Sequence, residues 1–361
     1  MRNSPSTSAA APSISCRQYS LAAFPVVSRL PDRSRILRWS AHSGVLRLES
    51  VAMRGTFRYV VVDVFTDKPL TGNQLAVFTD AREIPEDMLQ PLAREMAFSE
   101  TVFVYPPTRS ESADEKALQG ALDRESDDET VFVLPAEAGG HVRIRIFTPA
   151  TELPFAGHPV LGSAFVLGAP LQLVEIRLET GAGVIPVTLE REGARITFGR
   201  MQQPIPNWEP FAQAEELQEL LGVRSQLPVE AYDLGPHHVF LELGSKAEVA
   251  ALEPDFGALA RLTHIGVNCF AGSGTSWKTR MFAPASGVAE DPATGSACGP
   301  LGMHLARHGR IEFGQEVEVS QGAEVGRPST LYVRVDGSAD QIERVEVGGS
   351  AVVVARGEFR L

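Results

Sequence analysis

The chain alternates short apolar runs with a few amphipathic segments. Runs rich in β-branched and aromatic residues predict strands at 59–65, 75–80, 142–147, 195–199 and 237–243. Helical periodicity predicts helices at 85–98, which has a proline near its start and acids in its first turn, and at 214–223. Because the order is mixed and not a regular strand–helix series, the pattern predicts an α+β fold.

An internal repeat adds to this pattern. The segment "RIFTPATELPFAGHPVLGSAFVLG" starts at Arg145, and "RMFAPASGVAEDPATGSACGPLGMHLARHG" starts at Arg280. Each goes from a strand ending in Phe-x-Pro-Ala, through small residues and an acid, to a proline-containing helix start with Gly-Ser-Ala. Two copies predict two similar domains that face each other across a cleft, each aiming a helix N-terminus inward. The alternative is a chance similarity among small residues.

Composition narrows the class of protein. The chain has 361 residues and a formal net charge of −12, which argues against a nucleic-acid surface or a polybasic membrane patch. No apolar run is long enough to span a bilayer. The three cysteines, Cys16, Cys269 and Cys298, form neither a disulfide framework nor a metal spacing. They predict free thiols in a reducing compartment, and hence a cytoplasmic protein.

Two stretches fall outside the regular pattern. Residues 1–55 are rich in Ser and Arg and poor in acids, while an apparent start follows at Met53. They are interpreted as a disordered or non-native extension, from a wrong start codon, a flexible tail or an organellar transit peptide. The acidic stretch 106–130 is expected to be a surface insert between two strands.

The stretch "AEDPATGSA" holds the first candidate chemistry. Asp291 before Pro292 predicts an N-cap and a first helical residue. The amides of Thr294, Gly295 and Ser296 would then lie in the first turn, where they can cradle a phosphate or a carboxylate. The plain alternative is that Asp291 only caps a helix.

Three further polar residues stand at predicted element ends. His158 lies at the start of the other helix of the repeat, where a neutral ring is favoured. Glu100 lies between a helix and an apolar strand, where partial desolvation would raise its pKa. Asn73 follows a glycine in a turn and suits a polar substrate. Each could instead be structural: a backbone-bonded histidine, a capping glutamate or a turn asparagine.

Phosphate-loop, dinucleotide and zinc-protease motifs are absent from the sequence, and His237 and His238 lack a metal spacing. No cofactor and no metal are therefore expected. Glu, His and Asp at two opposed helix starts suit proton transfer at a carbon next to a carboxylate.

The motifs "GNQLAVF", "REMAFSETVFV", "AGHPVLGSA" and "EDPATGSACGPLG" resemble the PhzF-like phenazine-biosynthesis family, from about Phe57 to the C-terminus. The resemblance implies a diaminopimelate-epimerase-like fold. In this fold, each of two similar domains is a β-barrel-like sheet wrapped around a central helix, and the active site lies between the domains. We expect these domains at 56–182 and 183–361, with a last strand that can return to the first. The family resemblance also implies that the protein is a homodimer and needs no cofactor.

The implied activity is isomerisation of trans-2,3-dihydro-3-hydroxyanthranilate, in which a proton moves from C3 to C1. By motif, Glu100 matches the glutamate that takes and returns the proton, and His158 and Asp291 match its assisting pair. Gly157, Gly295 and Ser296 match positions whose amides hold the substrate carboxylate. We add Asn73 and Thr294 as expected substrate-binding residues.

Three alternatives remain. A thiol epimerase of the same fold would need one cysteine on each helix start, and only Cys298 lies near one. A related isomerase could act on another small cyclic or amino-acid-like carboxylate. A non-catalytic binding protein would not require Glu100, His158 and Asp291 to converge on one place.

Overall fold

The computed structural model describes residues 35–39, 46–50, 55–108 and 139–361. Cys16, most of the N-terminal extension and nearly all of the acidic insert lie outside these residues, as does the strand expected after the insert. The chain divides into two compact units, Met1–Met53 and Arg54–Leu361. In the first unit, β1 (Arg35–Trp39) and β2 (Leu46–Ser50) pair antiparallel. Whether 1–55 is a non-native extension stays a prediction.

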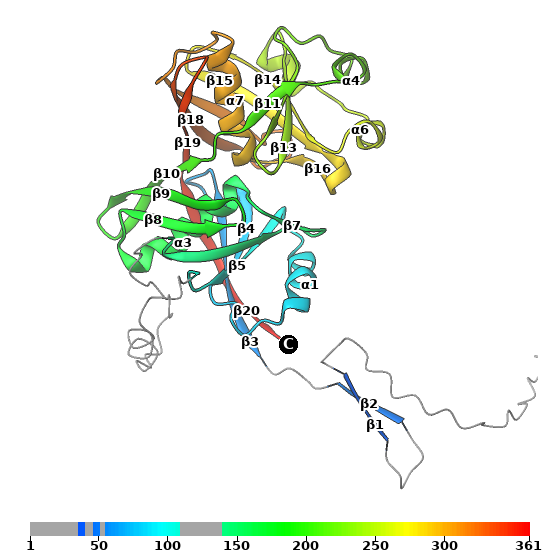
Figure 1. Cartoon of the computed structure of the whole chain (residues 1–361), viewed down its shortest axis with the longest axis vertical. Coiled ribbons are helices and arrows are strands. Elements are labelled where there is room, and N and C mark those ends of the chain that lie inside the picture. The colour runs from blue at the N-terminus through cyan, green and yellow to red at the C-terminus, as the bar shows by residue number, and fades with distance from the viewer. Residues whose placement is uncertain (1–34, 40–45, 51–54, 109–138) are drawn as a thin grey trace, which may run out of the picture. The chain divides into compact units, whose positions relative to one another are not determined.

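The second unit contains two halves of similar topology (Figure 1). The strands of the first half are β3 (Thr56–Val64), β4 (Asn73–Phe78), β5 (Glu100–Tyr105), β6 (Val142–Phe147), β7 (Glu152–Leu153), β8 (Glu175–Thr180), β9 (Gly183–Glu192) and β10 (Arg195–Gln203). Its helices are α1 (Glu86–Met96) and α3 (Gly157–Leu171). Helix α3 contacts strands along the whole sheet, from β3 and β4 to β9 and β10. The sheet therefore wraps around one central helix.

The second half repeats this plan around another helix. Its strands are β11 (Asn207–Pro210), β12 (Glu230–Asp233), β13 (His237–Glu242), β14 (Gly266–Ser273), β15 (Ser276–Ala283), β16 (Val288–Asp291), β17 (Glu316–Gln321), β18 (Ser329–Gly337) and β19 (Ile342–Gly349). Its helices are α4 (Ala214–Leu221), α5 (Lys246–Ala250), α6 (Phe256–Leu262), the 3₁₀ turn η1 (Pro284–Ser286) and the central α7 (Gly295–Arg307). Helix α7 contacts β13, β18 and β19.

Strand directions confirm the internal repeat. In the first half, β4 and β5 are parallel, β5 and β6 antiparallel, and β6 and β8 parallel. In the second half, β13 and β14 are parallel, β14 and β15 antiparallel, and β15 and β17 parallel. In both halves a short strand, β7 or β16, pairs with the strand before it and precedes the central helix. The α+β fold with two similar halves is therefore confirmed.

Two strands join the halves. Strand β10 pairs with β9 on one edge and with β19 on the other. Strand β20 (Ala351–Arg360) follows β19 in sequence but pairs with β3 of the first half, where Figure 1 shows it in red beside the blue β3. Strand pairing thus carries the first sheet through β9 and β10, past the expected boundary at 182/183. The domain bounds themselves stay a prediction.

The two central helices are buried because small or apolar residues make up most of their sequences. All residues of α7 from Gly295 to Ala306 are buried. A cluster of apolar side chains contains Leu161 of α3 and Leu301 of α7 together with strand residues of both halves. Glycine brings the strands close: a Cβ on Gly162 would lie 2.7 Å from Leu75 Cδ2. The halves therefore share one core.

The remaining helices cover the outer faces of the sheets. Helix α1, expected from its periodicity, packs Leu89 and Leu92 against Phe78 and Phe103. Helix α4, also expected, joins Leu217 to a second-half cluster that includes Leu259 of α6. Among the described residues, no helix is long and apolar enough to cross a membrane.

The division into two units and the pairing of β20 with β3 give a prediction about stability. Removal of residues 1–52, so that the chain starts at Met53, should leave the thermal unfolding midpoint unchanged, because the second unit begins at Arg54. Removal of 351–361 should abolish cooperative unfolding, because β20 pairs with β3 along nearly its whole length. Circular dichroism of both truncated proteins measures this. A large loss of stability in the first would contradict the prediction.

Candidate active site

Three elements bring the predicted acid–base residues together. Glu100 is the first residue of β5, His158 the second residue of α3, and Asp291 the last residue of β16. Glu100 Oε2 lies 3.4 Å from His158 Nε2. Asn73 connects His158 to Asp291, since its Nδ2 lies 3.3 Å from His158 Nδ1 and donates to Asp291 Oδ1 at 2.9 Å. The expected convergence of the three residues is confirmed.

The two central helices begin against each other at this place. A Cβ on Gly157 would lie 2.4 Å from the carbonyl carbon of Gly295 and 2.5 Å from the amide nitrogen of Ser296. A Cβ on Gly295 would lie 3.0 Å from the amide nitrogen of His158. Only glycine fits at this approach. The positive ends of two helix dipoles therefore meet within one site, as the repeat predicted.

The expected helix cap at Asp291 is wrong. Helix α7 begins at Gly295 with Thr294 as its N-cap, and Asp291 belongs to β16. Asp291 belongs to the strand because it pairs with Met281 of β15. The strand ends there because the next residue, Pro292, has no backbone N–H to donate. Thr294 Oγ1 donates to Asp291 Oδ2 at 2.6 Å. The carboxylate therefore lies before the helix and accepts hydrogen bonds from side chains, and it does not cap the helix.

Asp291 is a buried carboxylate with a full set of donors. Asn73 Nδ2, Ser99 Oγ at 3.1 Å and Thr294 Oγ1 all donate to it. Burial raises the pKa of Asp291 to about 6, and these hydrogen bonds oppose that rise. Asp291 is therefore held mostly ionised at neutral pH.

Glu100 lies in the same place with no such support. Burial raises the pKa of Glu100 well above its usual range, and the Asp291 carboxylate raises it further. Among the described residues, neither Glu100 Oε2 nor His158 Nε2 has a hydrogen-bond partner with acceptable geometry, although both are buried. Buried polar atoms without partners are costly, and they occur at functional sites. The two atoms form the open part of the site.

His158 is neutral. Burial lowers its pKa to about 3, and a hydrogen bond with the Gln74 backbone opposes part of this shift. The sequence argument attributed a neutral ring to the helix start, whereas burial is the larger cause. A neutral imidazole beside Glu100 can donate or accept one hydrogen bond but adds no fixed charge.

Asn73 and Thr294 hold the site together. The two shortest contacts of Asn73 Nδ2 are with Asp291 Oδ1 and the Ala293 carbonyl, both at 2.9 Å, and they use its two amide hydrogens. The Thr294 amide donates to Gln321 Oε1 at 3.1 Å. Their expected contact with substrate stays a prediction. Gly295 and Ser296 are the first two residues of α7, and the expected binding of an anion by their amides also stays a prediction.

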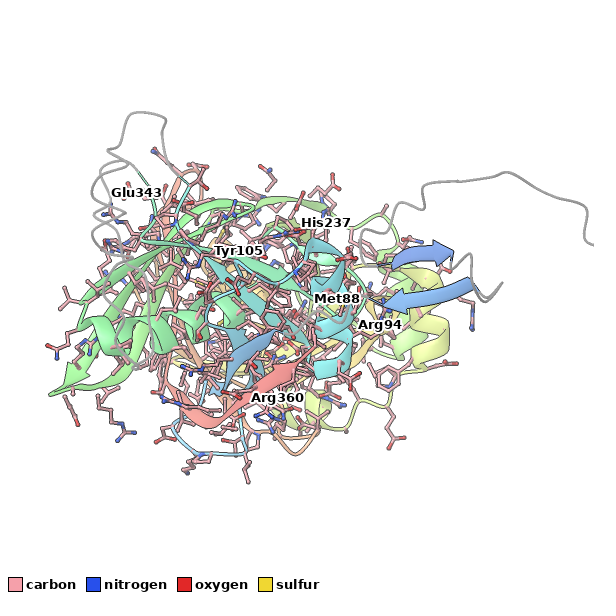
Figure 2. All side chains as sticks on the ribbon, turned by 90° about the horizontal axis from the view of Figure 1, so that it is seen from below. Met88, Arg94, Tyr105, His237, Glu343 and Arg360 are labelled. Carbon is pink, nitrogen blue, oxygen red and sulfur yellow. The ribbon has the colours of Figure 1, made fainter. Side chains whose placement is uncertain are left out.

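A cavity of about 910 Å³ lies beside the site, although none of the three residues lines it. Its wall includes Ser99 and Glu290, the chain neighbours of Glu100 and Asp291, and it draws on both halves. Helix α1 contributes Arg94, which Figure 2 marks. This volume suits a small organic ligand.

The described cysteines do not form a two-thiol pair. Cys269 and Cys298 are free and buried, in β14 and in the interior of α7. Burial raises the pKa of both thiols, that of Cys269 to about 12. Raised pKa values keep both thiols protonated at neutral pH, and a protonated thiol is a poor nucleophile and a poor base. The geometry therefore does not favour the thiol-epimerase alternative.

Glu230, His304 and His308 are the group of described residues with metal-ligand geometry, and their ligand atoms lie within 4.8 Å of one another. Arg307 Nη1 donates to the same Glu230 Oε2 at 2.7 Å. The arginine already neutralises this carboxylate, and we assign no metal there.

Sequence reasoning missed four residues that support the site. Gln321 Nε2 donates to the Asp291 carbonyl at 2.8 Å, and Gln203 Nε2 donates to the Gly295 carbonyl at 2.7 Å. Ser99 bonds Asp291, and His238 Nε2 lies 3.1 Å from Ser296 Oγ. None of the four lies within the two repeated segments, which start at Arg145 and Arg280, so the repeat gave no signal for them.

Comparison with known proteins identifies the class. The family model described as phenazine biosynthesis-like protein matches residues 62–117 and 108–357. A Pseudomonas aeruginosa protein named trans-2,3-dihydro-3-hydroxyanthranilate isomerase is 45% identical over 305 residues, covering 84% of this chain and 99% of that protein. The chain belongs to the phenazine biosynthesis-like, or PhzF, family.

Solved structures agree on the fold. A PhzF-family phenazine biosynthesis protein of Bacillus anthracis has a TM-score of 0.66 at 23% identity, covering 84% of this chain and 99% of its own. A hydroxyproline epimerase of Agrobacterium vitis has a TM-score of 0.53 at 12% identity, covering 86% and 94%. The epimerase-like fold expected from the sequence is confirmed.

The meeting of the two helix starts gives the next prediction. Gly157→Ala should lower the free energy of unfolding by about 1–3 kcal/mol, because the new methyl group clashes with backbone. Gly257→Ala in α6 is the matched control. Its methyl group would meet only side-chain ends, at 3.3 Å and 3.5 Å, and should leave stability equal or higher. Urea unfolding measures both, and equal stability of the two variants would contradict the packing described.

Proposed function

We propose that this protein is a trans-2,3-dihydro-3-hydroxyanthranilate isomerase. Its relative from Pseudomonas aeruginosa carries that name and is matched along 99% of its length. A second relative of the same name, from Pseudomonas chlororaphis, is also 45% identical. The single observation in the structure that carries the proposal is the pair of buried, unpartnered atoms Glu100 Oε2 and His158 Nε2.

The proposed reaction is a proton shift within one molecule. The C3–H bond breaks, a C1–H bond forms, and the two ring double bonds each move by one position. The product is an enol at C3, which becomes a ketone when its hydroxyl proton moves to carbon. Atoms and electrons balance without an oxidant or a reductant. The aminoketone would then enter phenazine ring assembly.

Glu100 is the proposed base. A carboxylate with a raised pKa binds a proton more strongly than an ordinary carboxylate, which is what removal of a proton from carbon requires. It then returns the proton to C1 as an acid. The missing hydrogen-bond donors at Oε2 are consistent with this role, because donors to the carboxylate would weaken it as a base.

The helix starts are the proposed anion site. The amides of Gly157, Gly295 and Ser296 lie at the first turns of α3 and α7, where the helix dipoles favour negative charge. The substrate carboxylate sits on C1, next to the carbon that receives the proton. Asp291 and His158 are the proposed partners that bind the polar groups of the ring and keep Glu100 in place.

Assembly and location stay predictions. We propose a homodimer, which sedimentation of the purified protein decides. The free, buried Cys269 and Cys298 fit a reducing compartment, and so support the proposed cytoplasmic location.

Substitution of the proposed base tests the function directly. Glu100→Gln keeps the shape and removes the base, so kcat should fall by about a hundredfold or more while KM changes little. Cys298→Ala is the matched control and should be nearly silent, because this thiol only packs inside α7. Steady-state kinetics with trans-2,3-dihydro-3-hydroxyanthranilate measure both. If Glu100→Gln stayed active while Cys298→Ala lost activity, the assignment of Glu100 as the base would be wrong, and thiol chemistry would take its place.

The pH profile tests the coupling between the two carboxyls. Activity requires ionised Glu100, so kcat/KM should rise as the pH rises through the pKa of Glu100. This acid limb of the profile should lie at a pH well above the usual pKa range of carboxyl groups. Asp291 raises the pKa of Glu100, and Asp291→Asn should therefore move this limb to lower pH. Glu253→Gln removes an exposed charge from the cavity wall and should leave the limb in place. A limb that moves upward in Asp291→Asn would contradict this coupling.

A further inference from the structure

His238 contacts the first turn of α7 from a neighbouring strand. It is the second residue of β13 and is buried, and its Nε2 lies 3.1 Å from Ser296 Oγ. Ser296 is the second residue of α7, as His158 is the second residue of α3. In the first half, Asn73 at the start of β4 lies against α3, with its Nδ2 3.3 Å from His158 Nδ1. The repeat has thus placed one polar strand residue against each helix start.

The tautomer of His238 follows from Asn268. Asn268 Nδ2 donates to the Gly266 carbonyl at 3.2 Å and to the Val239 carbonyl at 3.3 Å, and lies 3.4 Å from His238 Nδ1. The two carbonyls fix the orientation of the amide, because a flipped amide would aim its oxygen at two carbonyl oxygens. Among the described residues, His238 Nδ1 thus faces an NH₂ group and no acceptor, so the ring proton belongs on Nε2.

This proton position determines what Ser296 can do. A protonated Nε2 donates to Ser296 Oγ, and the serine then keeps its own hydroxyl proton for another acceptor. Within the described residues, Ser296 Oγ has no other hydrogen-bond partner. Burial lowers the pKa of His238 to about 3, so the ring stays neutral and the arrangement persists across the neutral range.

We infer that His238 is a positioning residue, which holds Ser296 Oγ through an Nε2–H bond so that the serine hydroxyl donates to the substrate carboxylate. This inference rests on the proposed function, because that function places a carboxylate at the start of α7. The opposite tautomer would make Ser296 donate to His238 and leave a lone pair facing the substrate, which would repel an anion.

Kinetics of matched variants test the role. His238→Leu and Ser296→Ala should each raise KM about tenfold or more, since a hydrogen bond to a charged group is lost, with a smaller change in kcat. The double variant should be no worse than Ser296→Ala alone. His238→Gln keeps an N–H donor and should recover part of the loss. His237→Leu, at the exposed neighbour that Figure 2 marks, should match the unmodified protein.

Two results would overturn the inference. One is that His238→Leu costs as much in the Ser296→Ala background as in the unmodified chain, because the histidine would then act independently of Ser296. The other is an imidazole ¹⁵N spectrum of the full chain that places the His238 proton on Nδ1; we expect it on Nε2. The spectrum needs no activity, so an inactive unmodified protein would defeat only the proposed function, while the tautomer still decides the hydrogen bond.

Discussion

The approach of two helix starts is the constraint on which the rest of the structure depends. Gly157 and Gly295 have no side chains, and the backbones of α3 and α7 meet with no room for a Cβ between them. This contact joins two pseudo-symmetric halves and aligns two positive helix ends in one place. Beside this contact, Asp291 and the Oε2 atom of Glu100 are both buried.

Burial and hydrogen bonding together give the carboxyl groups of Glu100 and Asp291 different pKa values. Both carboxyls lose water, which raises both pKa values. Asp291 regains three donors from side chains of both halves, whereas Glu100 Oε2 regains none among the residues that the structure describes. The environment therefore keeps one carboxylate as a fixed charge and leaves the other poised to take up a proton. This difference follows from position alone, since Glu and Asp have similar reference pKa values.

The repeat in the sequence predicted much of the fold and the site, because two copies of one strand–helix unit constrain each other. It predicted the opposed helix starts with His158 and Asp291 beside them, and the family motif "SETVFV" added Glu100 to the same site. The helix cap at Asp291 was wrong because Asp-Pro can also end a strand, and only the pairing with Met281 distinguishes the two. The Asn73–Asp291 bond spans 218 residues, and no local pattern could predict it. Gln203 and Gln321 were missed for the same reason.

A substrate labelled with deuterium at C3 tests the central claim most directly, namely that the desolvated Glu100 removes the proton from carbon. Deuterium NMR would follow the label during incubation with the unmodified protein and with Glu100→Gln. The account predicts that the label leaves C3 with the unmodified protein, to C1 or to water, and stays on C3 with Glu100→Gln. Loss of the label from C3 at equal rates in both proteins would contradict it.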